Sequence, residues 1–515
     1  MRSRPVVALA ILLAWVAGLG MLVRREYFRP HLERLAEAAL RVSPAAIFYA
    51  VMQGDQQVGF ASSTIDTTMT TIEQRDYLVA DIPAGGTMHR AEVRTNVVLS
   101  RTLRLRSFEM SMEAEQAPLR VLGEVEGDTA LMVVVQQGEA RPDTQRIALT
   151  SGILLPTLVP LALALDDRPR VGKSYVLPVF DPGTLQNRDM RIDVRAESLF
   201  VVNDSSVFDS TSGRWFGVLP DTVRAWEIVS PAGSGIGGWV DERGRLVATS
   251  QMGFRLQRMP YEVAFENWRR QADTLRNRGP ARVTADRDII ETSAIAVSRR
   301  VPGNVSRLRV RLRGVDLDGF DLAGGRQRLM GDTLVIERED QAMLAARYGL
   351  LRGPERSGNP NLAAEQFLEV GHPEIIELAQ RLAGDSRQPH TVARRINRWV
   401  HDSIAKEVMI GIPSALHVLH TRRGDCNEHA QLFVALARAA GLPARVSSGL
   451  VYVDGKFYYH AWAEVMLHGW VAVDPTFDQF PADAAHVRFV AGGLGRQTEL
   501  LRLIGKLQID VLAAR

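Results

Sequence analysis

Cysteine is almost absent from this sequence: Cys426 is the only one among 515 residues. A single cysteine excludes an intramolecular disulfide. In an exported protein, a lone thiol is either a reactive group or a small buried side chain, and composition alone leaves both open.

The chain also lacks an excess of charge of one sign. It has 62 Lys and Arg against 59 Asp and Glu, which gives a net charge of +3. The basic residues form no concentrated block, so we predict no nucleic-acid partner. Contents of 46% hydrophobic and 23% charged residues are typical of a globular protein. The length suggests two to four domains.

Long apolar runs are missing after residue 25, but one precedes it, at 5–23. It is uncharged, and as a helix its nineteen residues would span about 28 Å, close to the thickness of a bilayer. We predict a transmembrane anchor at 1–25, a juxtamembrane helix at 26–43, and all later residues on the extracytoplasmic side, periplasmic or at the cell surface. A cleaved signal peptide is the alternative for the apolar run.

The residues after the anchor predict an α+β protein that begins with strands. Alternating apolar residues at 93–108 and a hairpin signal at 241–244 predict a β-rich curved sheet or partly open barrel, interrupted by short helices at 152–165. Strict alternation at 308–313 predicts a further strand. The predicted domains are a β-rich domain at 44–288, a small β-sandwich-like domain at 289–350, and a third domain at 361–515.

Within the third domain, the cysteine stands where a helix is expected to begin. Asp425 can cap the helix and Glu428 can complete a capping box, while Gly441 and Pro443 mark its end. Cys426 then takes the first helical position, where free N–H groups and the helix dipole favour a thiolate. It is a candidate nucleophile.

Two later stretches supply partners for a nucleophilic thiol. Residues 457–465 and 470–475 read as strands, and they carry His460 and Asp474. A thiol nucleophile needs a base for its proton, and the base needs a third group to hold its orientation. Cys426, His460 and Asp474 can fill these roles. Trp462 shares a strand face with His460 and could line the site or simply pack on the sheet.

Three motifs together resemble the core of the transglutaminase-like, or papain-like, thiol-enzyme superfamily. They are Gly-Asp-Cys-x-Glu-His-Ala-x-Leu-Phe at 424–433, His-Ala-Trp-Ala-Glu-Val at 460–465 and Val-Asp-Pro-Thr-Phe at 473–477. The resemblance implies a catalytic triad of Cys426, His460 and Asp474. It also implies attack on an amide carbonyl through a thioester, with the Cys426 N–H as one oxyanion donor and the second donor unidentified.

That chemistry requires no metal and no organic cofactor, and its substrate would be a protein or peptide. We expect a peptidase or amidase, and the alternatives are a protein-crosslinking transglutaminase or a catalytically silent binding scaffold. The rival for the site itself is zinc bound by His417, His420, Cys426 and His429, because their spacing resembles a metal motif. The sequence leaves the oligomeric state open.

The triad also makes a geometric demand on the two strands. His460 and Asp474 must share a face of an antiparallel pair, with a carboxylate oxygen within about 3.2 Å of a ring nitrogen. We expect a three-residue loop at 466–468, which would oppose them directly, or a bulge. A tight two-residue turn at His468-Gly469 would turn Asp474 to the other face.

Overall fold

A computed structural model describes residues 42–515, apart from short stretches at 116–117, 128, 139–140, 150–151, 167–168, 231–236, 252, 278–282, 341, 346–347 and 357. The predicted anchor at 5–23 and nearly all of the predicted juxtamembrane helix lie outside the described residues. Within the described part, no helix is both long enough and apolar enough to cross a membrane.

The N-terminal half is one antiparallel sheet of 14 strands, in the order β8-β7-β6-β5-β4-β3-β2-β1-β14-β13-β12-β11-β10-β9. Almost every strand pairs with its neighbour in sequence, and β1 pairs with β14. The sheet is therefore a meander whose two edges are β8 and β9. The strands are β1 (Ala45–Gln53), β2 (Gln56–Thr67), β3 (Thr71–Ala84), β4 (Thr87–Ser100), β5 (Leu105–Glu113), β6 (Leu119–Glu126), β7 (Ala130–Gln137), β8 (Asp143–Ala148), β9 (Ser174–Asp181), β10 (Gln186–Asp209), β11 (Arg214–Val229), β12 (Gly237–Asp241), β13 (Leu246–Gln251) and β14 (Phe254–Met259).

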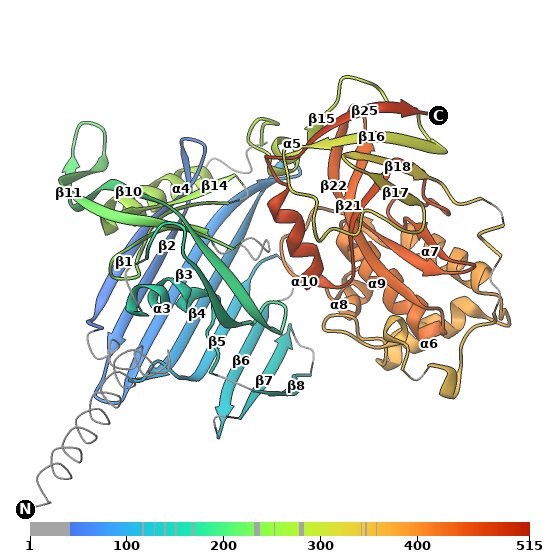
Figure 1. Ribbon diagram of the computed structural model, residues 1–515, viewed down its shortest axis with the longest axis horizontal. Helices are drawn as coiled ribbons and strands as arrows, with labels where there is room; N and C mark the ends of the chain where they lie inside the picture. The colour runs from blue at the N-terminus through green and yellow to red at the C-terminus, as the bar shows by residue number, and fades with distance from the viewer. Residues whose placement is uncertain are drawn as a thin grey trace, which may run out of the picture.

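The sheet curls around a short helical segment, which lies almost entirely within 152–165, where the sequence predicts short helices. This segment is η1 (Pro156–Leu158) followed by α3 (Val159–Asp166), and Figure 1 shows α3 between β9–β14 and the face of the earlier strands. Leu158 packs into a core with residues of β4 to β7, while Leu163 packs into a second core with β9 to β12. The Phe108 ring on β5 contacts the Phe180 ring on β9, with 5.8 Å between their centroids. Apolar side chains on both faces of the helical segment thus hold the curved sheet together. After β14, one turn of π-helix (Glu262–Glu266) leads into α4 (Asn267–Asn277).

The strands predicted within 289–350 are present, but their sheet is completed from elsewhere. The sheet has the order β17-β18-β16-β25, and its last strand comes from the C-terminus. Leu308 and Leu334 share one core with Leu450, Val487 and Ile509. This segment therefore packs as part of the C-terminal half, and the domain boundaries stay a prediction. The strands are β16 (Arg307–Arg313), β17 (Gln327–Met330), β18 (Thr333–Glu337) and β25 (Gln508–Ala514).

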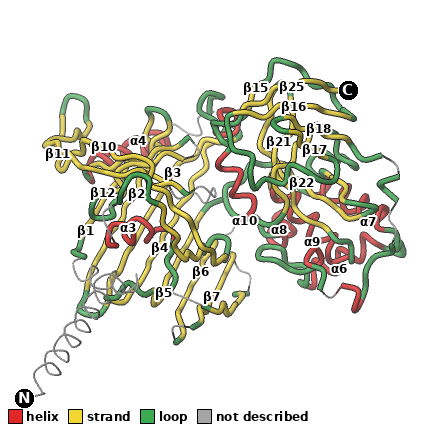
Figure 2. Tube along the Cα trace, viewed as in Figure 1, coloured by secondary structure: helices red, strands yellow, loops and turns green. Residues whose placement is uncertain are grey.

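The C-terminal half places helices against a second sheet, and Figure 2 shows this mixture of helix and strand. Helix α9 (Cys426–Ala440) is buried along nearly its whole length. Around it lie α6 (Pro373–Ala383), α7 (Pro389–Ser403) and α8 (Ala415–Thr421). The sheet has the order β15-β22-β21-β24, and β23 pairs with β22. Its strands are β15 (Ile295–Ala296), β21 (Ala444–Val453), β22 (Lys456–Met466), β23 (Trp470–Val473) and β24 (His486–Ala491).

The sequence of 489–508 predicts a helix that packs back on the third domain, and the structure contradicts this prediction. Strand β24 extends into this stretch, and only the short helices α10 (Leu494–Gln497) and η5 (Thr498–Arg502) follow before β25. The apolar residues of β24 belong to the shared core, so tertiary packing and sheet pairing outweigh the helical appearance of the sequence.

Candidate active site

Cys426 occupies the first position of α9, as predicted. The Asp425 side chain caps the helix and accepts a hydrogen bond from the Asn427 N–H at 2.9 Å. The Asp425 N–H donates to Glu428 Oε2 at 2.8 Å, which completes the capping box. A Cβ atom on Gly424 would lie 2.3 Å from the Glu428 side chain. The absence of a side chain at Gly424 therefore leaves room for the Glu428 side chain to fold back to the Asp425 N–H.

The surroundings of Cys426 do not favour its thiolate, contrary to the sequence prediction. Burial raises the pKa of the Cys426 thiol well above its usual value, and the Asp425 charge raises it further. A backbone hydrogen bond from Ala461 works in the opposite direction but is outweighed. Burial also raises the pKa of Asp425 itself, helped by the nearby Glu428 carboxylate. Desolvation and these acids therefore oppose the thiolate that the helix N-terminus alone would favour.

His460 and Asp474 are brought together by the β22–β23 hairpin, with a register that differs from the one predicted. The closing pair is Met466–Trp470, so the loop has three residues, at 467–469 rather than 466–468. The last strand pair is Ala463–Val473. Continuing this register by one residue places Asp474 opposite Trp462. Asp474 is then diagonal to His460, and the two side chains lie on the same face. Side chains on diagonal positions remain within reach, so direct opposition is unnecessary.

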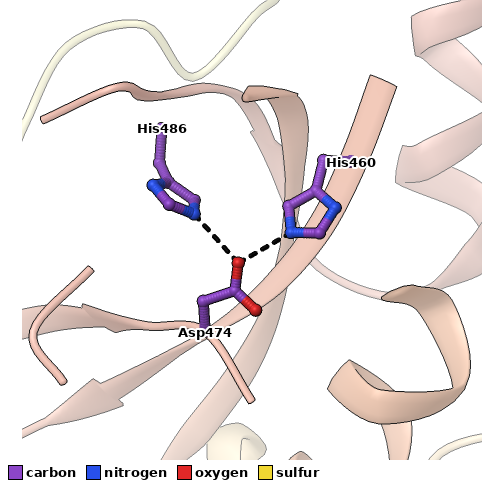
Figure 3. A group of neighbouring side chains, drawn as sticks. All are labelled: His460, Asp474 and His486. Atoms are coloured by element: carbon purple, nitrogen blue, oxygen red, sulfur yellow. Dashed lines mark hydrogen bonds and ion pairs between the residues drawn. The ribbon is translucent and has the colours of Figure 1, made fainter. Parts of the chain in front are cut away.

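The Asp474 carboxylate accepts four hydrogen bonds and is fully buried. Oδ2 accepts from His460 Nε2 at 2.7 Å and from His486 Nε2 at 2.9 Å (Figure 3). Oδ1 accepts from the backbone N–H groups of Thr476 and Phe477. Burial alone would raise the pKa of Asp474, but the two histidines hold that pKa far below its usual range. Asp474 is therefore an ionised and rigidly held acceptor for His460.

This geometry determines which ring nitrogen of His460 can accept a proton. Nε2 must donate its proton to the ionised carboxylate, so Nδ1 is the basic nitrogen, and it points away from Asp474 in Figure 3. The Cys426 sulfur lies against the backbone N–H of Ala461, the residue after His460. The Asp474 charge is also close enough to raise the pKa of the thiol. Cys426 therefore lies where α9 packs on β22, the strand that carries His460.

The predicted site-lining residue Trp462 is fully buried beneath the site rather than open to it. Its ring stacks on one side of His460, at 6.2 Å between centroids. Phe477 stacks on His460 at 5.0 Å and is 43% exposed. Phe477 thus covers His460 toward solvent, and Trp462 supports it from within.

His486 is the site residue that sequence reasoning missed. It begins β24, is fully buried, and touches Asp474 through Nε2 and Asp483 through Nδ1, the latter at 3.0 Å. The available signal was the alternating run His-Val-Arg-Phe-Val at 486–490, which is typical of a strand. Nothing local in that run indicates that its histidine reaches Asp474.

The zinc set considered from the sequence does not assemble. His420 pairs with Glu374, while His429 Nδ1 bonds to the backbone carbonyl of Asp425, and burial lowers the pKa of His429. Within the described residues, the one cluster with metal-ligand geometry is His460, Asp474 and His486. Their ligand atoms already satisfy one another as hydrogen-bond donors and acceptor, so the donor set is complete without an ion.

Comparison with known proteins identifies the family of this part of the chain. Residues 376–475 match the family model described as "Transglutaminase-like superfamily". This chain contains a transglutaminase-like domain. The matched range holds α9 and the β22–β23 hairpin, and so includes Cys426, His460 and Asp474.

Curated relatives match only part of this chain and only part of their own length. A protein-glutamine gamma-glutamyltransferase of Pseudomonas aeruginosa is 32% identical over 130 residues, covering 22% of this chain and 19% of its own length. An uncharacterised protein of Mycobacterium tuberculosis is 29% identical over 160 residues, covering 26% of this chain and 49% of its own length. The chain thus spans less than half the length of both relatives.

Solved structures are similar to parts of this chain. The periplasmic domain of TgpA from Pseudomonas aeruginosa, bound to ethylmercury, is 21% identical and has a TM-score of 0.23, covering 37% of this chain and 84% of that structure. A β-barrel-like protein of a domain of unknown function from Brucella abortus is 13% identical and has a TM-score of 0.27, covering 42% of this chain and 96% of that structure.

Proposed function

We propose that this protein is a thiol enzyme that cleaves or transfers an amide acyl group through a thioester on Cys426. The observation that carries the proposal is the 2.7 Å hydrogen bond from His460 Nε2 to the buried Asp474 carboxylate. It leaves Nδ1 of His460 basic at the place where the Cys426 helix begins. A base held by an acid beside a thiol at a helix N-terminus is the arrangement that acyl transfer needs.

The raised pKa of Cys426 determines the order of proton movement. The resting nucleophile is a thiol, so His460 Nδ1 takes its proton as sulfur attacks the carbonyl carbon. The resulting imidazolium is stabilised by ionised Asp474, and it then protonates the leaving amine. The Cys426 backbone N–H, free at the first helical position, is placed to donate to the oxyanion. Water or a second amine then releases the acyl group.

Hydrolysis of a peptide or other amide is the reaction we favour, and crosslinking is the alternative outcome of the same thioester. A catalytically silent binding scaffold is supported by one observation, the burial that raises the pKa of the thiol. The intact hydrogen-bonded pair of His460 and Asp474 supports the enzyme, because a scaffold does not require an oriented base.

We further propose that the chain is held in the cell membrane by residues 5–23, with the site on the extracytoplasmic side. The support is the uncharged apolar run with arginines on both flanks. Protease added to intact spheroplasts should degrade the chain beyond residue 25 and leave a membrane-bound N-terminal fragment. Protection until lysis would contradict the orientation, and a mature chain beginning near residue 20 would show that the run is a cleaved signal.

The reaction is tested by following three products from a protein mixture treated with the full chain. New peptide N-termini identify a peptidase, ammonia release without new N-termini identifies a side-chain amidase, and covalent uptake of a fluorescent primary amine identifies a crosslinking enzyme. All three signals should vanish in Cys426→Ala, which removes only the sulfur. Absence of all three products with the unaltered protein would favour the scaffold.

A further inference from the structure

The hydrogen-bonded chain at the site extends beyond the triad. It runs from His460 Nε2 to Asp474 Oδ2 and from the same oxygen to His486 Nε2 (Figure 3). It then continues from His486 Nδ1 to Asp483 Oδ1. His460 pairs with Gly449 of β21 on one side, and His486 pairs with Val451 on the other. The two histidines therefore share a face, two strands apart, with Asp474 between them.

The number of protons needed by this series of hydrogen bonds gives His486 a positive charge. Ionised carboxylates only accept hydrogen bonds, and a neutral imidazole has one donor nitrogen. His486 uses both nitrogens against carboxylate oxygens, at 2.9 and 3.0 Å, so both must carry protons. Burial disfavours this cation, but the hydrogen bonds and charges of Asp474 and Asp483 raise the pKa of His486 overall. In turn, His486 holds the pKa of Asp483 below its usual value.

The groups around His486 do not offer a different partner. The His486 ring lies edge-on to His460, at 5.9 Å between centroids, and to Trp462. Arg326 bonds to the backbone carbonyls of Ala482 and Asp483, and its charge favours ionised Asp483. On β24 itself, Arg488 is paired with Glu464. The net field at His486 is therefore set by the two aspartates that touch it.

We propose that His486 is a positioning residue, an imidazolium held between Asp474 and Asp483 that aims the Asp474 carboxylate at His460 and offsets its negative charge. This deepens the proposed function, on which it rests for the catalytic roles of Cys426 and His460. Asp474 without this cation would place an unbalanced buried charge beside Cys426 and oppose its ionisation. His486 thereby lets one carboxylate orient the base without suppressing thiolate formation.

The charge is tested directly in the full chain labelled with ¹⁵N-histidine. At pH 8, where histidines with ordinary pKa values are mostly neutral, a histidine should still show two protonated ring nitrogens, and its signals should disappear in His486→Gln. This measurement needs no substrate and no activity. A neutral His486 tautomer at pH 7, with one bare nitrogen, would overturn the proposal even if the enzyme is active.

The influence on the thiol is tested by alkylation, since Cys426 is the only cysteine and gives a single-site readout. Removing the cation should move the alkaline inflection of iodoacetamide alkylation to higher pH in His486→Gln, so that the rate at pH 8 falls about three- to tenfold. An inflection unchanged or moved to lower pH would overturn the proposal.

Asp483→Asn separates charge from orientation and also serves if His486→Gln does not fold. The asparagine leaves His486 able to bond Asp474 but no longer requires it to be charged. Its alkylation rate should match the unaltered protein at pH 6 and fall below it at pH 8, as His486 loses its proton. A deficit of equal size at both values would indicate a structural role only. If these profiles behave as expected but no acyl product appears, the proposed function fails while the inference about His486 stands.

Discussion

Asp474 reaches His460 diagonally across the β22–β23 hairpin, at 2.7 Å between Oδ2 and Nε2, rather than from the directly opposed position. The diagonal contact leaves the other side of the same oxygen open to His486, which approaches from β24 at 2.9 Å. One carboxylate can therefore serve two histidines.

Asp474→Asn should lower acyl-transfer activity by about 10²- to 10⁴-fold, with little change in KM. The amide has one acceptor oxygen and one donor nitrogen where Oδ1 and Oδ2 together accept four hydrogen bonds, so His460 loses its fixed tautomer. The product assays described above measure this. Asp454→Asn, at an exposed turn of the adjacent hairpin, is the matched control and should remain fully active. Activity of Asp474→Asn within threefold of the unaltered protein would remove Asp474 from the mechanism.

Cys426 should react with iodoacetamide more slowly at pH 7.5 in the folded chain than in the chain unfolded by urea. Burial and the nearby Asp425 carboxyl raise the pKa of the thiol, so less thiolate is present when the chain is folded. Mass spectrometry of the intact protein follows the reaction, and the unfolded sample confirms that one thiol is available. Faster labelling of the folded chain would instead indicate a preformed thiolate and imidazolium pair.

Folding stability should fall as the pH drops below about 4, near the ordinary pKa of an aspartate. The pKa values of Asp474 and Asp483 are lowered in the folded protein. Groups of this kind stabilise the fold above their unfolded pKa, and the contribution is lost as pH falls through the folded pKa. Urea unfolding followed between pH 7 and 3 measures the slope. The slope should be shallower in Asp474→Asn, and an identical slope would show that other carboxylates control acid unfolding.

His486 should give the opposite trend on the alkaline side. Its pKa is raised in the folded protein, so its contribution is complete below about pH 6.5 and is lost as the pH rises through the folded pKa. Thermal unfolding between pH 6 and 9 should therefore show a decline that is weaker in Asp483→Asn. A decline of the same size in both proteins would mean that His486 does not titrate in this range.

Gly424→Ala should destabilise the fold by about 1–3 kcal/mol and impair the site, because the new methyl group meets the Glu428 side chain at 2.3 Å. The capping box would open and the start of α9 would shift. Gly371→Ala is the control, since a Cβ atom there meets nothing within 4 Å and its backbone conformation suits alanine. Chemical unfolding compares the two variants, and equal stability of both would show that Gly424 is dispensable.

The sequence alone determined which residues make up the candidate site. The three motifs carry Cys426, His460 and Asp474, and local capping signals placed the cysteine at the first turn of α9, where the structure has it. Capping boxes and alternating strands depend on residues a few positions apart, so they can be read without the fold. The β-rich first half was predictable for the same reason.

Only the tertiary structure decided the direction of the pKa shifts at that site and which residues contact Asp474. The raised pKa of Cys426 follows from desolvation and from nearby acids such as Asp425 and Asp474, and the fold decides how closely Asp474 approaches the thiol. The third partner of Asp474 comes from β24, a strand whose place is fixed by pairing with β21 rather than by its own pattern. Long-range pairing likewise brings β25 beside β16, almost 200 residues earlier, and no local signal encodes such a contact.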